Sequence, residues 1–154
     1  MERTDSRHIV AEYPGLHGIN VLVVEDHADT ADMLAEALRF CDAYAVTANS
    51  ARSALHAFNT MTACDVVVTD LSMPADDGVW LLQQIRASGR PRTRVIAVTG
   101  HAVDKARRMV RGVRFDAILM KPFDPFGVCH MVLEVLGPER DGALSALVGE
   151  AVSG

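Results

Sequence analysis

The sequence predicts a three-layer α/β sandwich, in which a parallel sheet of five strands lies between two layers of helices. Short apolar runs rich in β-branched residues recur along the chain, and such non-alternating runs are typical of strands buried on both faces. The segments between them carry apolar residues three or four positions apart, which is the spacing of one helix face. A regular alternation of strands and helices favours a parallel sheet with right-handed crossovers.

Five apolar runs are expected to form the strands: residues 19–24, Ala43–Ala48, Asp65–Thr69, Val95–Val98 and Phe115–Met120. Five βα units of this kind suggest a flavodoxin-like parallel sheet with strand order 2-1-3-4-5. The order is an inference from the alternation, because periodicity does not show which strands pair. It would place the first and third strands side by side in the middle of the sheet.

Capping and turn residues set the expected helix boundaries. The expected starts are Asp29 or Thr30, Asn49 or Ser50, Asp77-Gly78, Ala102 and Asp124, and the last two helices are expected to reach Arg111 and about Leu136. In the first helix the predicted inward residues are Met33, Leu34, Ala37, Leu38 and Cys41. These positions follow the 3.6-residue repeat of a helix that covers a sheet.

Length and composition indicate one globular domain with polar ends. The chain has 154 residues, enough for a normal hydrophobic core. Residues 1–18 are expected to form a flexible leader, residues 19–137 the domain, and residues 138–154 a tail with a possible short helix at Ala143–Val152. Hydrophobic residues make up 49% and charged residues 23% of the chain, which argues against intrinsic disorder.

Charge and cysteine content narrow the class of protein further. The net charge of −5 disfavours direct binding to nucleic acid, which needs a basic surface. The three cysteines are scattered without metal-ligand spacing, and they are expected to be buried thiols in a reducing compartment. No apolar run approaches the roughly 20 residues of a membrane span, and no secretory signal is apparent. We therefore expect a cytoplasmic protein that does not insert into a membrane.

Polar side chains stand at the ends of four predicted strands. Glu25 and Asp26 follow the first apolar run, Asp70 the third, Thr99 the fourth and Lys121 the fifth. The carboxyl ends of parallel strands line one edge of a sheet, and ligands bind there. Three carboxylates, a hydroxyl and an ammonium at this edge would make a cation site beside a phosphoryl site.

Together these residues resemble the receiver domain of bacterial response regulators over about residues 19–137. The resemblance rests on four motifs: Val23-Val24-Glu25-Asp26, Asp70-Leu71-Ser72-Met73-Pro74 with Asp77-Gly78, Thr99-Gly100 and Lys121-Pro122-Phe123. Each motif alone is weak, but their order and their places at strand ends make a specific pattern.

The resemblance implies that Asp70 accepts a phosphoryl group from a histidine kinase or a histidine phosphotransfer protein. Thr99 and Lys121 would bind the phosphoryl oxygens. A carboxylate needs no general base to act as a nucleophile, and phosphoryl transfer depends mainly on positioning and charge neutralisation.

The resemblance also implies a Mg²⁺ site. Asp26, Asp70 and the carbonyl of Ser72 would contact the ion, and Glu25 would hold a metal-bound water. Mg²⁺ takes oxygen ligands in an octahedron and keeps several waters, so a few carboxylates suit it. His27 follows the acidic pair, and it is expected to be a solvent-facing loop residue because Mg²⁺ prefers oxygen.

Three positions depart from the family's usual pattern. Ile118 stands where the family usually carries the Tyr or Phe whose rotation reports phosphorylation. Because Ile is shorter and has a stiff χ1, the usual coupling to Thr99 is not expected in its ordinary form. Arg114 occupies a position where Gly is common, with Gly112 two residues earlier, and Asp76 replaces a frequent Met near the rim of the site.

The expected function is that of a stand-alone receiver, a phosphorylation-controlled switch that is not an enzyme and acts by protein contact. The 17 residues after position 137 are too few for a helix-turn-helix reader, so a DNA-binding output is disfavoured. Downstream partners are expected on the face formed by residues 102–136. A basic stretch on this face is either a solvated helix surface or a docking site for an acidic partner, and it consists of Lys105, Arg107, Arg108, Arg111 and Arg114.

Two alternatives belong to other functional classes. A receiver-like binding module that works without phosphate is disfavoured by the intact acidic residues, Thr99 and Lys121, whereas Ile118 leaves it open. A phosphatase with an aspartyl nucleophile would need a second Asp two residues after the first, and Ser72 stands there instead.

Overall fold

The computed structural model describes residues 14–90, 92–100, 102–110 and 112–137. Within these ranges a five-stranded sheet has the strand order β2-β1-β3-β4-β5, and all four pairings are parallel. The strands are β1 (Asn20–Val24), β2 (Tyr44–Ala48), β3 (Val66–Asp70), β4 (Arg94–Thr99) and β5 (Ala117–Met120). The predicted fold class and strand order are therefore confirmed.

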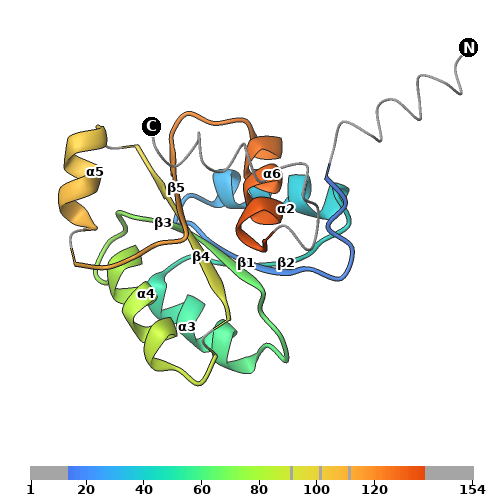
Figure 1. The fold of residues 1–154 in the computed structure, drawn as a ribbon, viewed down its shortest axis with the longest axis horizontal. Coiled ribbons are helices and arrows are strands. Elements are labelled where there is room, and N and C mark those ends of the chain that lie inside the picture. Colours follow the sequence, from blue (N-terminus) through green and yellow to red (C-terminus); the bar gives the residue numbers. More distant parts are fainter. Residues whose placement is uncertain (1–13, 91, 101, 111, 138–154) are drawn as a thin grey trace, which may run out of the picture.

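Helices cover both faces of the sheet (Figure 1). They are α2 (Ala28–Phe40), α3 (Ala51–Thr60), α4 (Gly78–Ala87), α5 (Val103–Met109) and α6 (Pro125–Val135). Helices α2 and α6 share one hydrophobic cluster with the sheet, and α3 and α4 share another on the opposite face. The short helix α5 packs against a third, small cluster beside β4 and β5.

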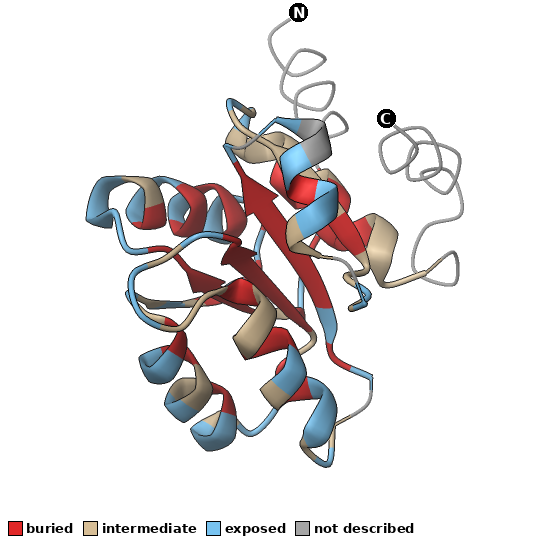
Figure 2. Ribbon diagram, turned by 90° about the vertical axis from the view of Figure 1, so that its left-hand side faces the viewer, coloured by how far each residue is buried: buried red, intermediate tan, exposed pale blue. Residues whose placement is uncertain are grey.

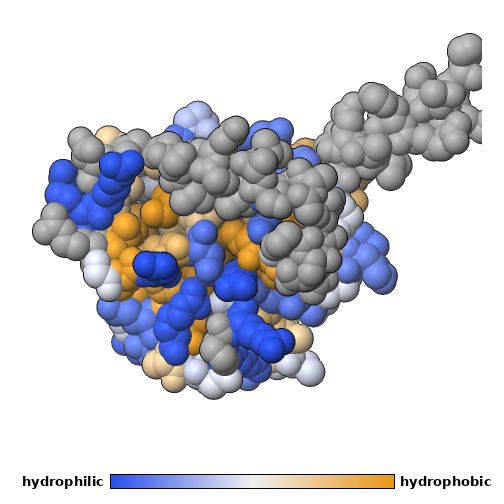
Figure 3. All heavy atoms as spheres, viewed as in Figure 1, coloured by the Kyte–Doolittle hydropathy of each residue, from blue (hydrophilic) through white to orange (hydrophobic). Residues whose placement is uncertain are grey.

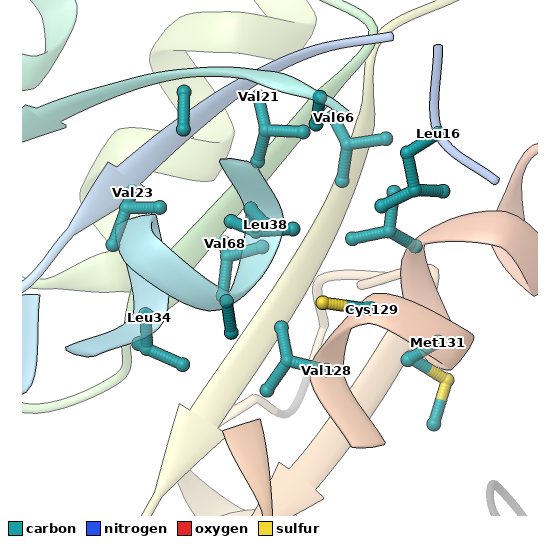
Figure 4. Close-up of a cluster of buried hydrophobic side chains, with 14 of the residues drawn as sticks. Leu16, Val21, Val23, Leu34, Leu38, Val66, Val68, Val128, Cys129 and Met131 are labelled. Carbon is teal, nitrogen blue, oxygen red and sulfur yellow. The ribbon is translucent and has the colours of Figure 1, made fainter. Parts of the chain in front are cut away.

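The central strands are buried on both faces, which explains their uninterrupted apolar sequences. Along β1, Val21 and Val23 belong to the cluster beneath α2 and α6, whereas Leu22 belongs to the cluster beneath α3 and α4. Figure 2 shows these strands as buried ribbons between partly exposed helices. Figure 4 shows the first cluster, in which Val128 and Cys129 of α6 face the valines of the sheet.

Capping residues fix the starts of three helices where the sequence places them. The side chain of Ser50 accepts a hydrogen bond from the Ser53 N–H and begins α3. The side chain of Asp77 accepts from the Trp80 N–H at the start of α4. The side chain of Asp124 accepts from the Phe126 N–H at the start of α6. Each cap satisfies a backbone donor that the helix itself leaves unpaired.

Several predicted boundaries and one predicted core residue are wrong. Helix α2 begins at Ala28 after His27, earlier than Asp29 or Thr30, and the Glu25 carboxylate accepts the His27 N–H directly before it. Met33 is 47% exposed and lies outside the buried stripe of that helix. Strand β5 begins at Ala117, two residues later than predicted. Helix α5 covers only Val103–Met109, and the predicted end at Arg111 lies outside the described residues.

The predicted leader extends too far along the chain. Leu16 is completely buried in the cluster beneath α2 and α6. Its N–H donates to the Cys41 carbonyl and its own carbonyl accepts from the Ile19 N–H. The packed domain therefore includes residues 14–18, whereas residues 1–13 of the predicted leader and the predicted tail at 138–154 lie outside the described part of the chain.

Candidate functional site

The carboxylates of Glu25 and Asp70 come from neighbouring strands in the middle of the sheet. β1 and β3 pair in parallel with Val24 opposite Thr69, so the residues that follow them stand side by side at the carboxyl edge. Both side chains are largely shielded from solvent, with Glu25 3% and Asp70 8% exposed. Two shielded carboxylates repel each other unless a positive charge compensates them.

Lys121 supplies that positive charge. Its Nζ lies 3.3 Å from Glu25 Oε1 and 3.3 Å from Asp70 Oδ2, so one ammonium bridges the two carboxylates. The Lys121 N–H donates to the Thr99 carbonyl, which anchors the residue beside the end of β4. Burial alone would lower the pKa of Lys121, but the charges of Asp70 and Glu25 raise it above its usual value. Lys121 therefore keeps its charge throughout the physiological pH range.

Asp26 and His27 form the open side of the site. The Asp26 side chain is 29% and that of His27 78% exposed, and His27 Nδ1 lies 3.7 Å from Asp26 Oδ1. Glu25, Asp26 and His27 can each direct one ligand atom so that all lie within 4.8 Å of one another. The carboxylate oxygens of this group fit a hard cation such as Mg²⁺, whereas the exposed imidazole does not match its preference for oxygen.

The loop after Asp70 is anchored by backbone contacts around the carboxylate. The Ser72 N–H donates to Asp70 Oδ1, and the Gly78 N–H donates to the Leu71 carbonyl. A Cβ atom on Gly78 would lie 2.6 Å from the Asp70 carbonyl oxygen. The sequence placed Asp77-Gly78 in a motif, but only the geometry shows that glycine lets the start of α4 approach the end of β3 this closely.

Asp76, expected to add negative charge near the site, is neutralised by Arg52 of α3. Arg52 Nε lies 2.6 Å from Asp76 Oδ2, and the same guanidinium stacks over the Trp80 ring at 4.9 Å. The sequence does not reveal this contact, because Arg52 and Asp76 are separated by 24 positions. The loop that follows Asp70 is thereby tied to α3 as well as to α4.

Thr99 and Ile118 connect the site with α5. Thr99 is completely buried at the end of β4, three residues before the Ala102 cap of α5. Ile118 packs against a cluster of Leu71, Ala97 and Ala106, which joins the residue after Asp70 to a helix on the molecular surface. The structure thus brings Glu25, Asp70 and Lys121 into contact and places the remaining predicted site residues at the same edge: Asp26, Ser72 and Thr99.

A family model described as the response regulator receiver domain matches residues 21–133. Among curated proteins, the chain is 37% identical over 105 residues to the regulatory protein AtoC of Escherichia coli, covering 68% of this chain and 22% of AtoC. It is 30% identical over 126 residues to the probable transcriptional regulator ycf27 of Guillardia theta, covering 82% of this chain and 48% of ycf27. The chain therefore spans at most about half of these two relatives.

Another relative is the sensor histidine kinase RcsC of Salmonella typhimurium, which is 33% identical over 102 residues, or 66% of this chain and 10% of RcsC. Solved structures show the same fold. A CheY-like receiver domain protein from Methanospirillum hungatei superimposes with a TM-score of 0.71 and 24% identity, covering 81% of this chain and 98% of that one. Response regulator TrrA of Thermotoga maritima, solved with Mg²⁺ and BeF, gives a TM-score of 0.65 and 22% identity over 77% of this chain and 99% of that one.

None of the described helices has both the length and the apolar character that a membrane span requires. The matched family covers the sheet, apart from Asn20 at the start of β1, and the strand-end residues described above. This chain belongs to the response regulator receiver domain family, whose members are phosphorylation-dependent switches in two-component signalling.

Proposed function

We propose that Asp70 is the residue that accepts the phosphoryl group. The observation that carries this proposal is the contact of its Oδ2 with Lys121 Nζ at 3.3 Å, at the end of a central strand. Asp70 combines a shielded carboxylate with an adjacent fixed positive charge, which is the arrangement that phosphoryl transfer requires. Glu25 shares the same ammonium but follows the neighbouring strand β1.

In the proposed reaction an Asp70 carboxylate oxygen attacks the phosphorus of a phosphohistidine. The new O–P bond forms as the P–N bond breaks, and the electron pair of that bond leaves with the imidazole, which takes a proton from water. Lys121 holds one of the phosphoryl oxygens by charge and the hydroxyl of Thr99 donates to another. Positioning and charge neutralisation are the main contributions of a protein to such a step.

Asp26, Asp70 and the Ser72 carbonyl are the proposed ligands of a Mg²⁺ ion, with Glu25 holding a metal-bound water. The open Asp26 carboxylate beside the shielded Glu25 supports this proposal, since Mg²⁺ retains several waters and takes few protein ligands. When bound, the ion would supply positive charge to the phosphoryl oxygens. From the protein side, Lys121 supplies positive charge beside the carboxylates of Glu25 and Asp70.

The proposed phosphoryl donor is a histidine kinase or a histidine phosphotransfer protein. Similarity to RcsC, which is named a sensor histidine kinase, supports this class of partner. The reaction places the donor at the carboxyl edge of the sheet, where the side chain of Asp26 is open to solvent. We propose a cytoplasmic location on the same grounds, because such donors transfer phosphate inside the cell.

The proposed output surface is the face formed by residues 102–136. The cluster of Leu71, Ala97 and Ala106, with Ile118, provides a packed connection from the phosphoacceptor loop to α5. Figure 3 shows hydrophilic side chains over α5 beside an apolar area toward β5. Lys105, Arg107 and Arg108 are exposed there, so an acidic protein partner would be attracted to this face.

A second candidate is a receiver-like module that binds its partner without phosphorylation. Ile118 favours it, because this side chain is packed in the α5 cluster and is too short for the large rotation of an aromatic ring. The two candidates differ in one measurable property, the chemical reactivity of Asp70. No feature of the described site favours an aspartyl phosphatase, since Ser72 lacks the acid needed two residues after the nucleophile.

Intact mass measurement after incubation with acetyl phosphate and Mg²⁺ tests the proposal. The wild-type chain should gain one phosphoryl group, and Asp70→Asn should gain none. Asp29→Asn is a matched control, because Asp29 is an exposed carboxylate in the first turn of α2, and it should be labelled like the wild type. Labelling of Asp70→Asn at the wild-type level would overturn the assignment, and unlabelled wild type would favour the phosphorylation-independent module.

A further inference from the structure

An apolar groove runs between α2 and α6 on the face away from α3 and α4. It is lined by Met33, Glu36, Ala37, Phe40, Pro125 and Phe126. Phe40 meets Phe126 edge to face, with ring centroids 5.6 Å apart. Despite this contact Phe40 is 66% exposed, and Met33 is 47% exposed. The groove therefore has a mostly apolar lining in which two large hydrophobic side chains, Met33 and Phe40, are partly accessible to solvent.

Large hydrophobic side chains are rarely exposed in the described part of the molecule. Three large hydrophobic residues are exposed there, and Met33 and Phe40 both belong to the groove. A cluster of apolar groups at one place on a soluble surface usually marks a contact with another segment or another molecule. Helix α2 otherwise follows the expected pattern, with its buried residues facing the sheet.

The sequence that follows α6 has the pattern of a helix with one apolar face. In residues 143–152, Leu144, Leu147, Val148 and Ala151 stand at positions i, i+3, i+4 and i+7, which is the spacing of a single helical stripe. Ala146 falls on the opposite side of this helical wheel. The segment lies outside the described residues, so its pattern is a property of the sequence.

The distance from the end of α6 allows the following segment to reach the groove. Gly137 follows the end of α6, has φ = +104° and donates its N–H to the Glu134 carbonyl, as glycines commonly do at a helix end. Helix α6 has 11 residues and is therefore roughly 16 Å long. Residues 138–142 can span roughly 17 Å when extended, so a helix at 143–152 can lie antiparallel to α6 along its whole length.

We propose that residues 143–152 dock as a short helix in the groove between α2 and α6 of the same chain. Leu144, Leu147 and Val148 face Met33, Phe40 and Phe126 in this arrangement. The connection of only five residues keeps the segment close to the groove, which favours an intramolecular contact over capture of another chain. The docking is independent of the phosphorylation of Asp70 and is tested without any phosphoryl donor.

Disulfide trapping in the full chain tests the proposal. The pair Met33→Cys and Val148→Cys should form an intrachain disulfide on mild oxidation, detected by mass in the monomer. The matched pair Met33→Cys and Ala146→Cys has nearly the same tether length but places the thiol on the opposite side of the proposed helix, so it should form the bond at least several-fold more slowly. The native cysteines do not interfere because all three are buried.

Equal trapping rates for the two pairs would overturn the docked helix, because they would mean that the segment samples the groove without a preferred face. Disulfide-linked dimers in place of intrachain bonds would also overturn it, because they would mean that the segment of a second copy of the chain occupies the groove. Amide exchange gives an independent reading. Leu147→Glu should increase exchange in α2 and α6 whereas Ala146→Glu should not, and unchanged exchange in both variants would contradict the proposal.

Discussion

At the scale of single residues, the site depends on how closely the start of α4 can approach the end of β3. Gly78 is the first residue of α4 and lies against the backbone of Asp70. Its lack of a side chain permits this close approach to the backbone of Asp70 and Leu71. The role of this glycine is steric and does not rest on an unusual backbone angle, since Gly78 is absent from the residues with positive φ.

Gly78→Ala should therefore destabilise the protein. The added Cβ would lie 2.6 Å from the Asp70 carbonyl oxygen, and relieving such a contact with backbone typically costs about 1–3 kcal/mol. Gly127→Ala in α6 is the control, because among the described residues the nearest atom outside the helix backbone to its Cβ would be Asp124 Cβ, at 4.0 Å. That variant should be stabilised by about 0.5–1 kcal/mol. Urea unfolding measures the stability of both variants, and equal urea midpoints for the two would contradict the steric argument.

Asp26 is the residue whose removal should most affect Mg²⁺ binding. Its carboxylate is open to solvent and is not held by Lys121, so Asp26→Asn should fold normally. We expect its Mg²⁺ affinity to fall by about tenfold or more, which corresponds to about 1.4 kcal/mol or more of binding free energy. Titration calorimetry provides the measurement, with Asp29→Asn as control. Unchanged affinity in Asp26→Asn would place the cation elsewhere.

The strand-end positions of Glu25, Asp70, Thr99 and Lys121 could be predicted from the sequence. A polar residue that directly follows a buried apolar run marks the point where the predicted strand ends. The contacts of these residues could not be predicted. Lys121 contacts Asp70, which is 51 positions away in the sequence, and Glu25, which is 96 positions away. Contacts between residues so far apart cannot be inferred from local periodicity. The same limit applies to the ion pair between Arg52 and Asp76.

At the scale of elements, helix starts with a side-chain cap were predictable, whereas the start of α2 was not. The capping residues Ser50, Asp77 and Asp124 act within three positions of themselves, so the signal is local. Helix α2 lacks a side-chain cap at His27 and starts where the Glu25 carboxylate captures a backbone donor. The side chain of a site residue thus contacts the backbone at this element boundary.

Helix α5 is the element that should respond to phosphorylation. Movement of Thr99 toward a phosphoryl group on Asp70 would displace the chain that leads into α5, and the cluster around Ile118 would have to repack. Amide exchange with and without beryllofluoride, a phosphoryl mimic, should therefore differ over residues 99–109. Asp70→Asn is the control and should show no difference. Changes confined to residues 70–77 would mean that the signal stops at the phosphoacceptor loop.

At the scale of the whole molecule, burial on both faces of the sheet is what made the fold predictable. The valines of β1 and β3 alternate between two clusters, so the consecutive positions 21–24 and 66–68 are all apolar. The packed role of Leu16 could not be predicted, since a single apolar residue between Gly15 and His17 has no periodicity. It enters the core through two backbone hydrogen bonds with Cys41 and Ile19.

The stability of the whole molecule should fall at alkaline pH because of buried thiols. Burial, with a smaller effect of the Asp65 charge, raises the pKa of Cys64 from 9.0 to about 12. Because the folded-state value is the higher one, its contribution is complete below pH 9 and is lost as the pH rises toward 12. By pH 10.5 this thiol alone should lower the free energy of unfolding by about 2 kcal/mol.

Urea unfolding between pH 8 and 10.5 measures this effect. The unfolding free energy of the wild type should decline steeply above pH 9. That of Cys64→Ala should decline less steeply with pH, whatever its value at pH 8. Some decline should persist in the variant, because burial also raises the pKa of Cys129. Parallel pH profiles for the two proteins would show that Cys64 does not contribute.

The stacking of Arg52 on Trp80 gives the protein a built-in optical probe. Trp80 is the only tryptophan in the chain, and the guanidinium above its ring is bonded to the loop that follows Asp70. Any rearrangement of that loop changes the electric field at the indole and therefore its emission spectrum. Stopped-flow fluorescence can thus follow events at Asp70 in real time without attaching a dye.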